Sequence, residues 1–195
     1  SKSIKFTEFN MKSLQILVAG GTGFIGQALI KNRLSLGDKI TVLGRNKTKI
    51  YKAFTSDVAA MHWSEIAPEQ LKKFDVIINL AGANIGEKRW SKKQKKIIIN
   101  SRIITTNKLA KACATLGKNA PHLYNASAVG IYGPSEHIAD ENNHNINNEP
   151  VNFLQDVAQK WENATNVAKQ AGCQVTNLRF APVLSKQGGM LKKLI

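Results

Sequence analysis

Residues 15–30 join two hydrophobic patterns through a glycine-rich segment. Residues 16–19 (ILVA) form a continuous apolar run, which is typical of a buried strand. The segment from Gly20 to Gly26 follows at once, and apolar residues then recur at helical spacing, at Phe24, Ala28, Leu29 and Leu34. The pattern predicts a strand, a tight glycine turn and the N-terminus of a helix.

The rest of the chain alternates strand-like with helix-like patterns. Further strands are predicted at 39–43, 59–63, 74–80, 122–127 and 174–180, and further helices at 48–54, 91–116 and 152–171. Gly117 and Gly172 end the two long helices. Alternation through six strands predicts an α/β fold: a Rossmann-type, doubly wound parallel sheet in the order 3-2-1-4-5-6, with flanking helices and right-handed crossovers.

Length and composition fit a single domain. The 195 residues are 43% hydrophobic, which is ordinary for a globular protein and enough for a full core. Residues 1–10 show no regular period and precede Met11, so we expect a leader or an expression remnant there and one domain over 11–195. No apolar run reaches the roughly 18 residues of a membrane span. We therefore expect a cytoplasmic protein without a membrane partner.

The cysteines and the charged residues could indicate a metal or a nucleic-acid ligand. Cys113 and Cys173 lack metal-ligand spacing, so we expect core residues and no metal. The net charge is +15, and six basic residues lie between Lys88 and Lys96. Such a cluster could meet nucleic acid or an acidic membrane. A solvated loop and helix start is favoured, because no nucleic-acid motif accompanies it, and a nearby phosphorylated ligand would also explain it.

The glycine-rich turn carries the clearest chemistry. Gly21, Gly23 and Gly26 match the G-x-G-x-x-G dinucleotide fingerprint, and Gly20 extends it. Glycines are needed there because the turn is tight, the backbone touches a pyrophosphate and the helix lies close to the strand. A glycine turn without a ligand is the alternative. The predicted cofactor contacts are Gly20, Gly21, Thr22, Gly23, Phe24, Ile25 and Gly26, with Leu80, Ala81 and Gly82 at the end of the strand over 74–80.

The end of the second strand predicts the type of dinucleotide. An acidic residue there would hold the ribose 2′-hydroxyl of NAD(H), whereas an arginine accommodates the 2′-phosphate of NADP(H). The chain has Arg45 in the sequence GRNK and no Asp or Glu from Lys39 to Phe54. We expect NADP(H), with NAD(H) as the alternative if Arg45 only caps the sheet edge.

Several motifs together resemble a known family. They are GGTGFIG, NLAGANI, EKRWSKKQKKIIINSRIITT, NASAVGIYG, the pair Trp161-Glu162 and LRFAPVLS. They are similar to the extended, atypical short-chain dehydrogenase/reductase superfamily, in its NAD-dependent epimerase/dehydratase branch and the sugar-nucleotide epimerase-like subgroup. The resemblance covers 14–195. It implies that relatives continue into a C-terminal lobe that forms much of the substrate pocket, so we expect that lobe to be missing here.

The resemblance also defines what is unusual about this chain. Members of the superfamily use a Tyr and, four residues later, a Lys, and the chain has no Y-x-x-x-K. Aligning Glu162 with the glutamate that follows the motif puts Leu154 and Ala158 at the Tyr and Lys places. Ser127 and Tyr132 are the remaining catalytic candidates. Packing at a Gly-Pro turn is the alternative for Tyr132.

Arg102 and the stretch 135–149 each have two alternative roles. Arg102 follows a family-like Ser101, and we predict that it contacts an anionic part of the cofactor; a salt bridge on the helix surface is the alternative. The polar stretch 135–149 is predicted to be a lid or substrate loop, or else a solvated insertion.

Two classes of function follow. The first is an NADP(H)-dependent oxidoreductase or epimerase acting on a hydroxyl or carbonyl of a small molecule such as a nucleotide sugar. The second is a dinucleotide-binding regulatory protein with little chemistry of its own. A nucleic-acid-binding module is the weaker third class, and an oligomer stays open.

Overall fold

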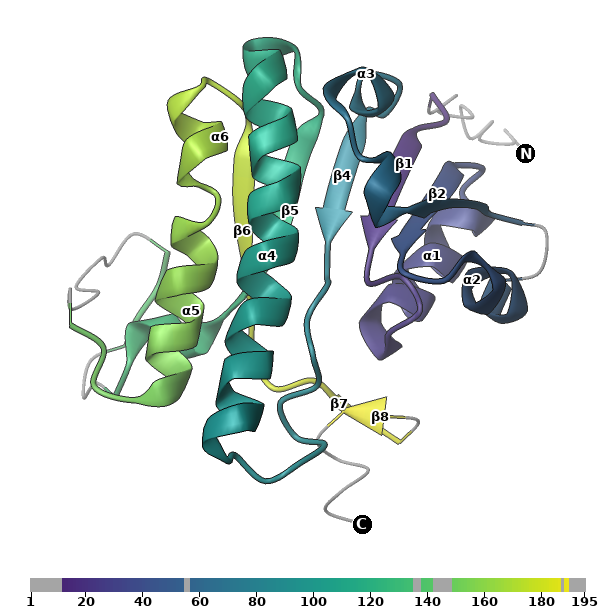
Figure 1. Cartoon of the computed structure of the whole chain (residues 1–195). Helices are drawn as coiled ribbons and strands as arrows, with labels where there is room; N and C mark the ends of the chain where they lie inside the picture. The colour runs from purple at the N-terminus through teal and green to yellow at the C-terminus, as the bar shows by residue number, and fades with distance from the viewer. Residues whose placement is uncertain (1–11, 55–56, 135–137, 142–148, 187, 190–195) are drawn as a thin grey trace, which may run out of the picture.

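The structure is a computed structural model, and it describes residues 12–54, 57–134, 138–141, 149–186 and 188–189. Six parallel strands form one sheet in the order β3-β2-β1-β4-β5-β6, which confirms the predicted topology (Figure 1). They are β1 (Gln15–Ala19), β2 (Lys39–Gly44), β3 (Ala59–His62), β4 (Val76–Asn79), β5 (His122–Ala128) and β6 (Val175–Phe180). A short antiparallel pair, β7 (Leu184–Ser185) and β8 (Gly188–Gly189), follows.

Helices cover both faces of the sheet. They are α1 (Phe24–Ser35), α2 (Lys47–Phe54), α3 (Pro68–Leu71), α4 (Lys92–Leu116), α5 (Phe153–Asn163) and α6 (Asn166–Gln170). Three 3₁₀ turns lie at Trp63–Glu65, Gly117–Asn119 and Val129–Tyr132. In Figure 1 the long α4 crosses the near face beside α5 and α6, while α1 and α2 lie on the right of the view, with β1 and β2.

Alternate strand residues supply two cores. Ile16 and Val18 of β1 pack with Ile30 of α1 and Ile50 of α2 in one core. Leu17 packs in the other core, which includes the α4 residues Leu109, Ala110 and Cys113. Both faces of the central strand are therefore apolar, which explains its uninterrupted apolar run. Cys113 and Cys173 are buried and free, as expected.

One local prediction was wrong. The helix predicted over 152–171 is two helices, α5 and α6, because the buried Thr165 turns its hydroxyl back to the Glu162 carbonyl oxygen (2.7 Å). A threonine that bonds its own backbone in this way competes with the helical hydrogen bonds. Phe24, one of the helically spaced apolar residues, is 40% exposed, whereas Gly26 and Ile30 are the buried residues of α1.

The carboxyl ends of the parallel strands define one rim of the sheet. α1 begins at this rim after β1, α2 begins there after β2, and a long segment descends from it between β4 and α4 (Figure 1). Ligands of open α/β sheets bind at this rim. Most of the predicted lid, 135–149, lies outside the described residues. Among the described residues, no helix is long and apolar enough to cross a membrane.

Candidate dinucleotide site and the adjoining polar network

The glycine corner between β1 and α1 is closed by backbone packing. Gly20 has φ +75°, and a Cβ there would lie 2.6 Å from the Leu80 carbonyl oxygen. A Cβ on Gly26 would lie 2.6 Å from the Gly20 oxygen, and one on Gly21 would lie 2.7 Å from Ile30 Cδ1. Three of the predicted glycines are thus needed for the corner to exist.

Gly23 differs from these three. It is the exposed N-cap of α1, with ordinary φ of −75°, and a Cβ there would meet only the Gly20 oxygen, at 3.2 Å. Space above Gly23 is therefore open to a ligand.

The first turn of α1 presents free hydrogen-bond donors to that space. Gly23 offers no capping side chain. Among the described residues, the amides of Phe24, Ile25 and Gly26 donate to no acceptor, whereas the next amide, of Gln27, donates to the Gly23 oxygen (2.9 Å). Three amides at the positive end of a helix form a cradle for an anion. The corner therefore fits the diphosphate of a dinucleotide.

The segment after β4 forms the neighbouring wall. The Leu80 backbone contacts Gly20, and the Ala81 amide donates to Asn79 Oδ1 (3.2 Å). Asn79 is fully buried and donates through Nδ2 to Asn125 Oδ1 (2.7 Å) and to Thr106 Oγ1 (2.9 Å). This buried network fixes the end of β4 against β5 and α4, and so sets the position of the wall.

Arg45 lies at the exposed end of β2. β2 pairs with β1, and Leu43 lies opposite Ala19. Arg45, two residues after Leu43, therefore lies at the same end of the sheet as the glycine corner, one strand away. Arg45 makes no salt bridge with the described residues. Glu65, which follows β3, pairs with Lys47 (2.7 Å), and the hydrogen bond from Lys47 lowers the pKa of Glu65.

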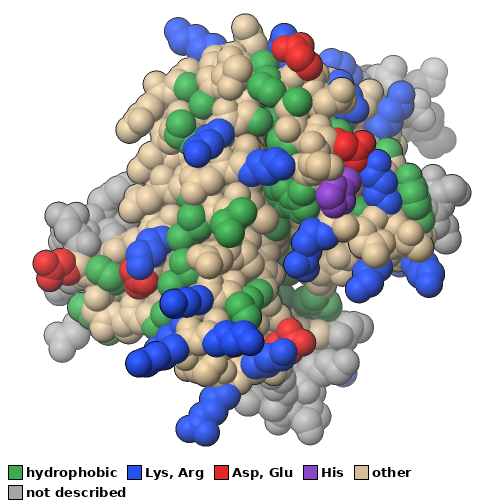
Figure 2. Space-filling model, in the orientation of Figure 1, with side chains coloured by type: hydrophobic (Ala, Val, Ile, Leu, Met, Phe, Trp, Pro, Cys, Tyr) green, Lys and Arg blue, Asp and Glu red, His purple; other side chains and the backbone are tan. Residues whose placement is uncertain are grey.

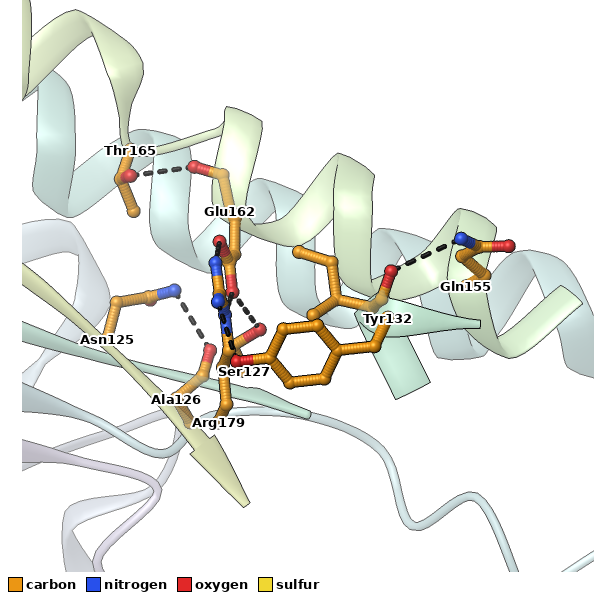
Figure 3. A network of polar contacts seen from close by, with 9 residues as sticks. Asn125, Ala126, Ser127, Tyr132, Gln155, Glu162, Thr165 and Arg179 are labelled. Carbon is orange, nitrogen blue, oxygen red and sulfur yellow. Dashed lines mark hydrogen bonds and ion pairs between the residues drawn. The ribbon is translucent and has the colours of Figure 1, made fainter. Parts of the chain in front are cut away.

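The two predicted catalytic residues belong to one polar network on the other side of the rim (Figure 3). Ser127 is 2% exposed, and its hydroxyl donates to Glu162 Oε1 (2.7 Å). Arg179 donates to the same carboxylate through Nε (2.9 Å) and Nη2 (3.1 Å). Its Nη1 donates to the Tyr132 hydroxyl oxygen (2.9 Å). Ser127 and Tyr132 are thus linked through a Glu–Arg pair.

Glu162 and Arg179 shift each other's pKa within this network. Burial raises the pKa of Glu162, but the hydrogen bonds from Arg179 and Ser127 outweigh it and leave that pKa below its ordinary value. The hydrogen bond with Glu162 raises the pKa of Arg179 further. The Ser127 hydroxyl donates to the carboxylate, whereas the Tyr132 hydroxyl oxygen accepts from Arg179.

Sequence reasoning did not find Arg179 as the partner of Tyr132. Strand register places it: Arg179 of β6 is opposite Ser127 of β5. The motif LRFAPVLS contains Arg179, but its partners depend on which strands are neighbours and on how α5 packs.

Arg102 lies apart from that network, on α4. Its Nη1 donates to the carbonyl oxygens of Ala83 (3.1 Å) and Ile98 (3.0 Å). It makes no salt bridge within the described chain, so the alternative of a helix-surface salt bridge is wrong there.

Two hollows adjoin the rim. One of about 230 Å³ is lined by Trp90, Gly130, Gly133, Asn152, Phe153 and Leu154. Leu154, at the place of the superfamily tyrosine, therefore borders a hollow, whereas Ala158, at the lysine place, is buried. The second hollow, about 680 Å³, runs along β6 and includes Tyr132 and Arg179.

The basic stretch surrounds the start of α4. Lys88, Arg89, Lys92, Lys93 and Lys96 are exposed, and the first turn of α4 contains no acid. Figure 2 shows Lys and Arg side chains gathered at the lower end of this face. Among the described residues, no group of three or more His, Cys, Asp or Glu is placed to hold a metal ion.

Comparison with known proteins agrees with this geometry. Residues 16–195 match the model of the NAD dependent epimerase/dehydratase family. The chain belongs to this family. Its members bind a dinucleotide, and the fingerprint corner described above is where this member has the geometry to do so.

Relatives of this epimerase family chain include two bacterial proteins described only as epimerase family proteins. Mb2239 of Mycobacterium bovis is 35% identical over 189 residues, covering 94% of this chain and 58% of the relative. SAOUHSC_00792 of Staphylococcus aureus is 32% identical over 182 residues, covering 92% and 59%. The chain thus spans somewhat more than half the length of these relatives.

Solved structures of the family have the same architecture. Human epimerase family protein SDR39U1 with NADPH superposes with a TM-score of 0.74 at 28% identity, over 93% of this chain and 58% of the human chain. A nucleoside-diphosphate sugar epimerase of Corynebacterium glutamicum superposes with a TM-score of 0.70 at 28% identity, over 93% and 37%. These similarities support the fold and the family; the roles of individual site residues stay predictions.

Proposed function

We propose that residues 11–195 form an NADP(H)-binding domain of an oxidoreductase or epimerase that acts on a hydroxyl or carbonyl group, with nucleotide-linked sugars as the proposed substrate class. NADP(H), when bound, supplies or accepts a hydride. The human relative was solved with NADPH, and the Corynebacterium relative is described as a nucleoside-diphosphate sugar epimerase. Both descriptions favour this assignment.

The observation that carries the choice of NADP(H) is the acid-free end of β2. Arg45 is exposed beside the glycine corner and has no carboxylate partner in the described chain. α2 begins two residues later, and Asn46 Oδ1 accepts from the Lys49 amide to cap it. A guanidinium at this point attracts a 2′-phosphate, and residues 39–54 contain no carboxylate that could hold the 2′-hydroxyl of NAD(H).

We assign the proton transfer to Tyr132. Its oxygen accepts a hydrogen bond from Arg179, so a positive charge lies 2.9 Å from the atom that would become negative when the phenol gives up its proton. Ser127 would support this residue through Glu162, because its own proton is engaged there.

A regulatory protein that binds NADP(H) without turnover is the second candidate. Leu154 and Ala158 favour it, because neither side chain can transfer a proton at the places of the superfamily Tyr and Lys. Assays with a panel of nucleotide sugars separate the two if they follow both net NADP(H) oxidation or reduction and the formation of an epimeric sugar, because epimerisation returns the hydride and leaves the cofactor unchanged. Binding of NADPH with neither reaction supports the regulatory protein.

The cofactor assignment is tested by titrating the protein with NADPH and with NADH and following tryptophan fluorescence. We expect NADPH to bind at least about tenfold more tightly, a difference of ~1.4 kcal/mol. Arg45→Gln should remove most of that preference, whereas Arg89→Gln, which removes the same charge from the basic stretch, should keep it. Equal affinities for the two cofactors in the unmodified protein would overturn the assignment.

A further inference from the structure

Arg102 is the one half-buried arginine of the described chain without a carboxylate partner. Arg33 pairs with Asp38 and Arg179 with Glu162, while Arg45 and Arg89 are exposed to water. The guanidinium carbon of Arg102 lies 4.8 Å from the Trp161 ring centroid, and only Nη1 donates to protein acceptors. Within the described chain, Nε and Nη2 have none.

This arrangement leaves a charge only partly compensated. Burial lowers the pKa of Arg102 to about 10, which means that the surroundings disfavour the cation. Carbonyl dipoles and a ring face compensate for lost water incompletely, whereas an oxyanion on the Nε–Nη2 edge would supply two charge-assisted hydrogen bonds.

The neighbouring glycine packs against one side of the guanidinium, next to Cζ and Nη1. Gly82 is exposed, and a Cβ there would lie 3.0 Å from Arg102 Cζ. Any other residue at this position would crowd the guanidinium. The guanidinium therefore lies against an exposed stretch of backbone and not under a side chain.

The position of Arg102 separates it from the cofactor diphosphate. Gly20 of the corner contacts Leu80, whereas Arg102 contacts Gly82 and Ala83, two to three residues farther along the segment. Two to three residues span at most roughly 7–10 Å. The free amides at the start of α1 fit the diphosphate by themselves, which leaves Arg102 for another group.

We propose that Arg102 binds an oxyanion, a phosphate or a carboxylate, that belongs to the substrate and not to the cofactor. This inference rests on the proposed function for its cofactor, since it places the substrate anion beyond a bound dinucleotide. It adds a requirement: the substrate is anionic near its reacting end.

Side-chain ¹⁵N NMR of arginine tests the inference on the whole protein, which has the five arginines Arg33, Arg45, Arg89, Arg102 and Arg179. The Nε–Hε signal of Arg102 is identified by its loss in Arg102→Lys. Protein saturated with NADPH is titrated with inorganic phosphate in one arm and with oxalate in the other. We expect the Arg102 signal to move saturably in at least one arm, and the ion that does it distinguishes phosphate from carboxylate.

The variants set the size of the effect. Arg102→Gln should weaken binding of that ion by about tenfold or more, measured by calorimetry, and Arg102→Lys should restore part of it. Gly82→Ala should weaken it without changing the charge. Arg89→Gln is the matched control and should change it less than about twofold.

The same titrations are repeated on NADPH-free protein. Three results would overturn the inference: no saturable movement with either ion in any titration, equal movement of the Arg45 and Arg89 signals, or a movement in NADPH-free protein that disappears in NADPH-saturated protein. The last result would mean that Arg102 binds the cofactor and not the substrate. Failure of the proposed function gives a different result. The Arg45 signal would then not move on addition of NADPH, whether or not phosphate or oxalate moves the Arg102 signal.

Discussion

The two sides of the sheet rim differ in how many of their hydrogen-bond donors the protein itself satisfies. On the β5–β6 side, Ser127, Arg179 and Glu162 satisfy one another. On the β1–β4 side, the Phe24, Ile25 and Gly26 amides have no acceptor in the described chain, and Arg102 has no carboxylate. Buried or half-buried donors are rarely left unused in folded proteins.

The difference separates stability from binding. A satisfied network contributes to the fold whether or not a ligand is present, whereas donors without acceptors contribute little until an anion arrives. Variants on the β5–β6 side should therefore lower stability and leave NADPH affinity unchanged. On the β1–β4 side, a variant at the exposed Gly23 should do the reverse, because a Cβ there meets only one atom.

The largest expected effect is a loss of stability in Glu162→Gln, on the β5–β6 side, whose donors the protein satisfies and which we call the satisfied side. This change leaves the Arg179 cation without its counter-charge, and the Arg179 and Glu162 side chains are only 19% and 12% exposed. Breaking a buried pair by removing one partner costs about 3–5 kcal/mol. Urea unfolding measures it.

Asp156→Asn on the same helix is the matched control. It removes the more exposed Lys160 pair, and such pairs contribute ~0–1 kcal/mol. Equal losses in the two variants would mean that the Glu162 network is not the special support that its geometry indicates.

The next largest effect is a loss of NADPH affinity in Gly23→Ala, on the β1–β4 side, which we call the open side because its donors lack acceptors in the described chain. The backbone of Gly23 suits any residue, and a Cβ meets only one atom, so unfolding free energy should fall by less than about 1 kcal/mol. NADPH affinity should fall about 10- to 100-fold, because the methyl group occupies the space of the diphosphate. A variant that binds NADPH as before would show that the corner does not hold it.

The pH dependence of stability gives a smaller effect on the satisfied side. The pKa of Glu162 is lower in the fold than its ordinary value of 4.5. Its contribution is therefore fully present above about pH 4.5 and is lost as the pH falls through the folded pKa. Unfolding free energies between pH 7 and pH 3 should fall less steeply in Glu162→Gln than in the unmodified protein. Parallel curves would contradict the lowered pKa.

Tyr132→Phe should have a small effect on stability. It removes the oxygen that accepts from Arg179, which costs about 0.5–1.5 kcal/mol, and NADPH affinity should stay the same. The enzyme assignment also requires that this variant lose most turnover of any substrate found; unchanged turnover would reduce Tyr132 to a packing residue.

The open side was also the more predictable from sequence. The strand, glycines and helix of the corner are consecutive, so residues 15–30 predict it by local pattern alone, and Arg45 follows from the end of the next strand. The satisfied side joins Ser127, Tyr132, Glu162 and Arg179 from separate elements. Their meeting depends on strand register and on the break at Thr165, which the apolar period of 152–171 continues through.

A crystal structure of the protein with bound NADPH tests the central claim most directly. We predict that the diphosphate accepts hydrogen bonds from the amides at the start of α1 and that the 2′-phosphate lies against Arg45. A diphosphate bound away from residues 20–26, or a 2′-phosphate pointing away from the end of β2, would contradict the account.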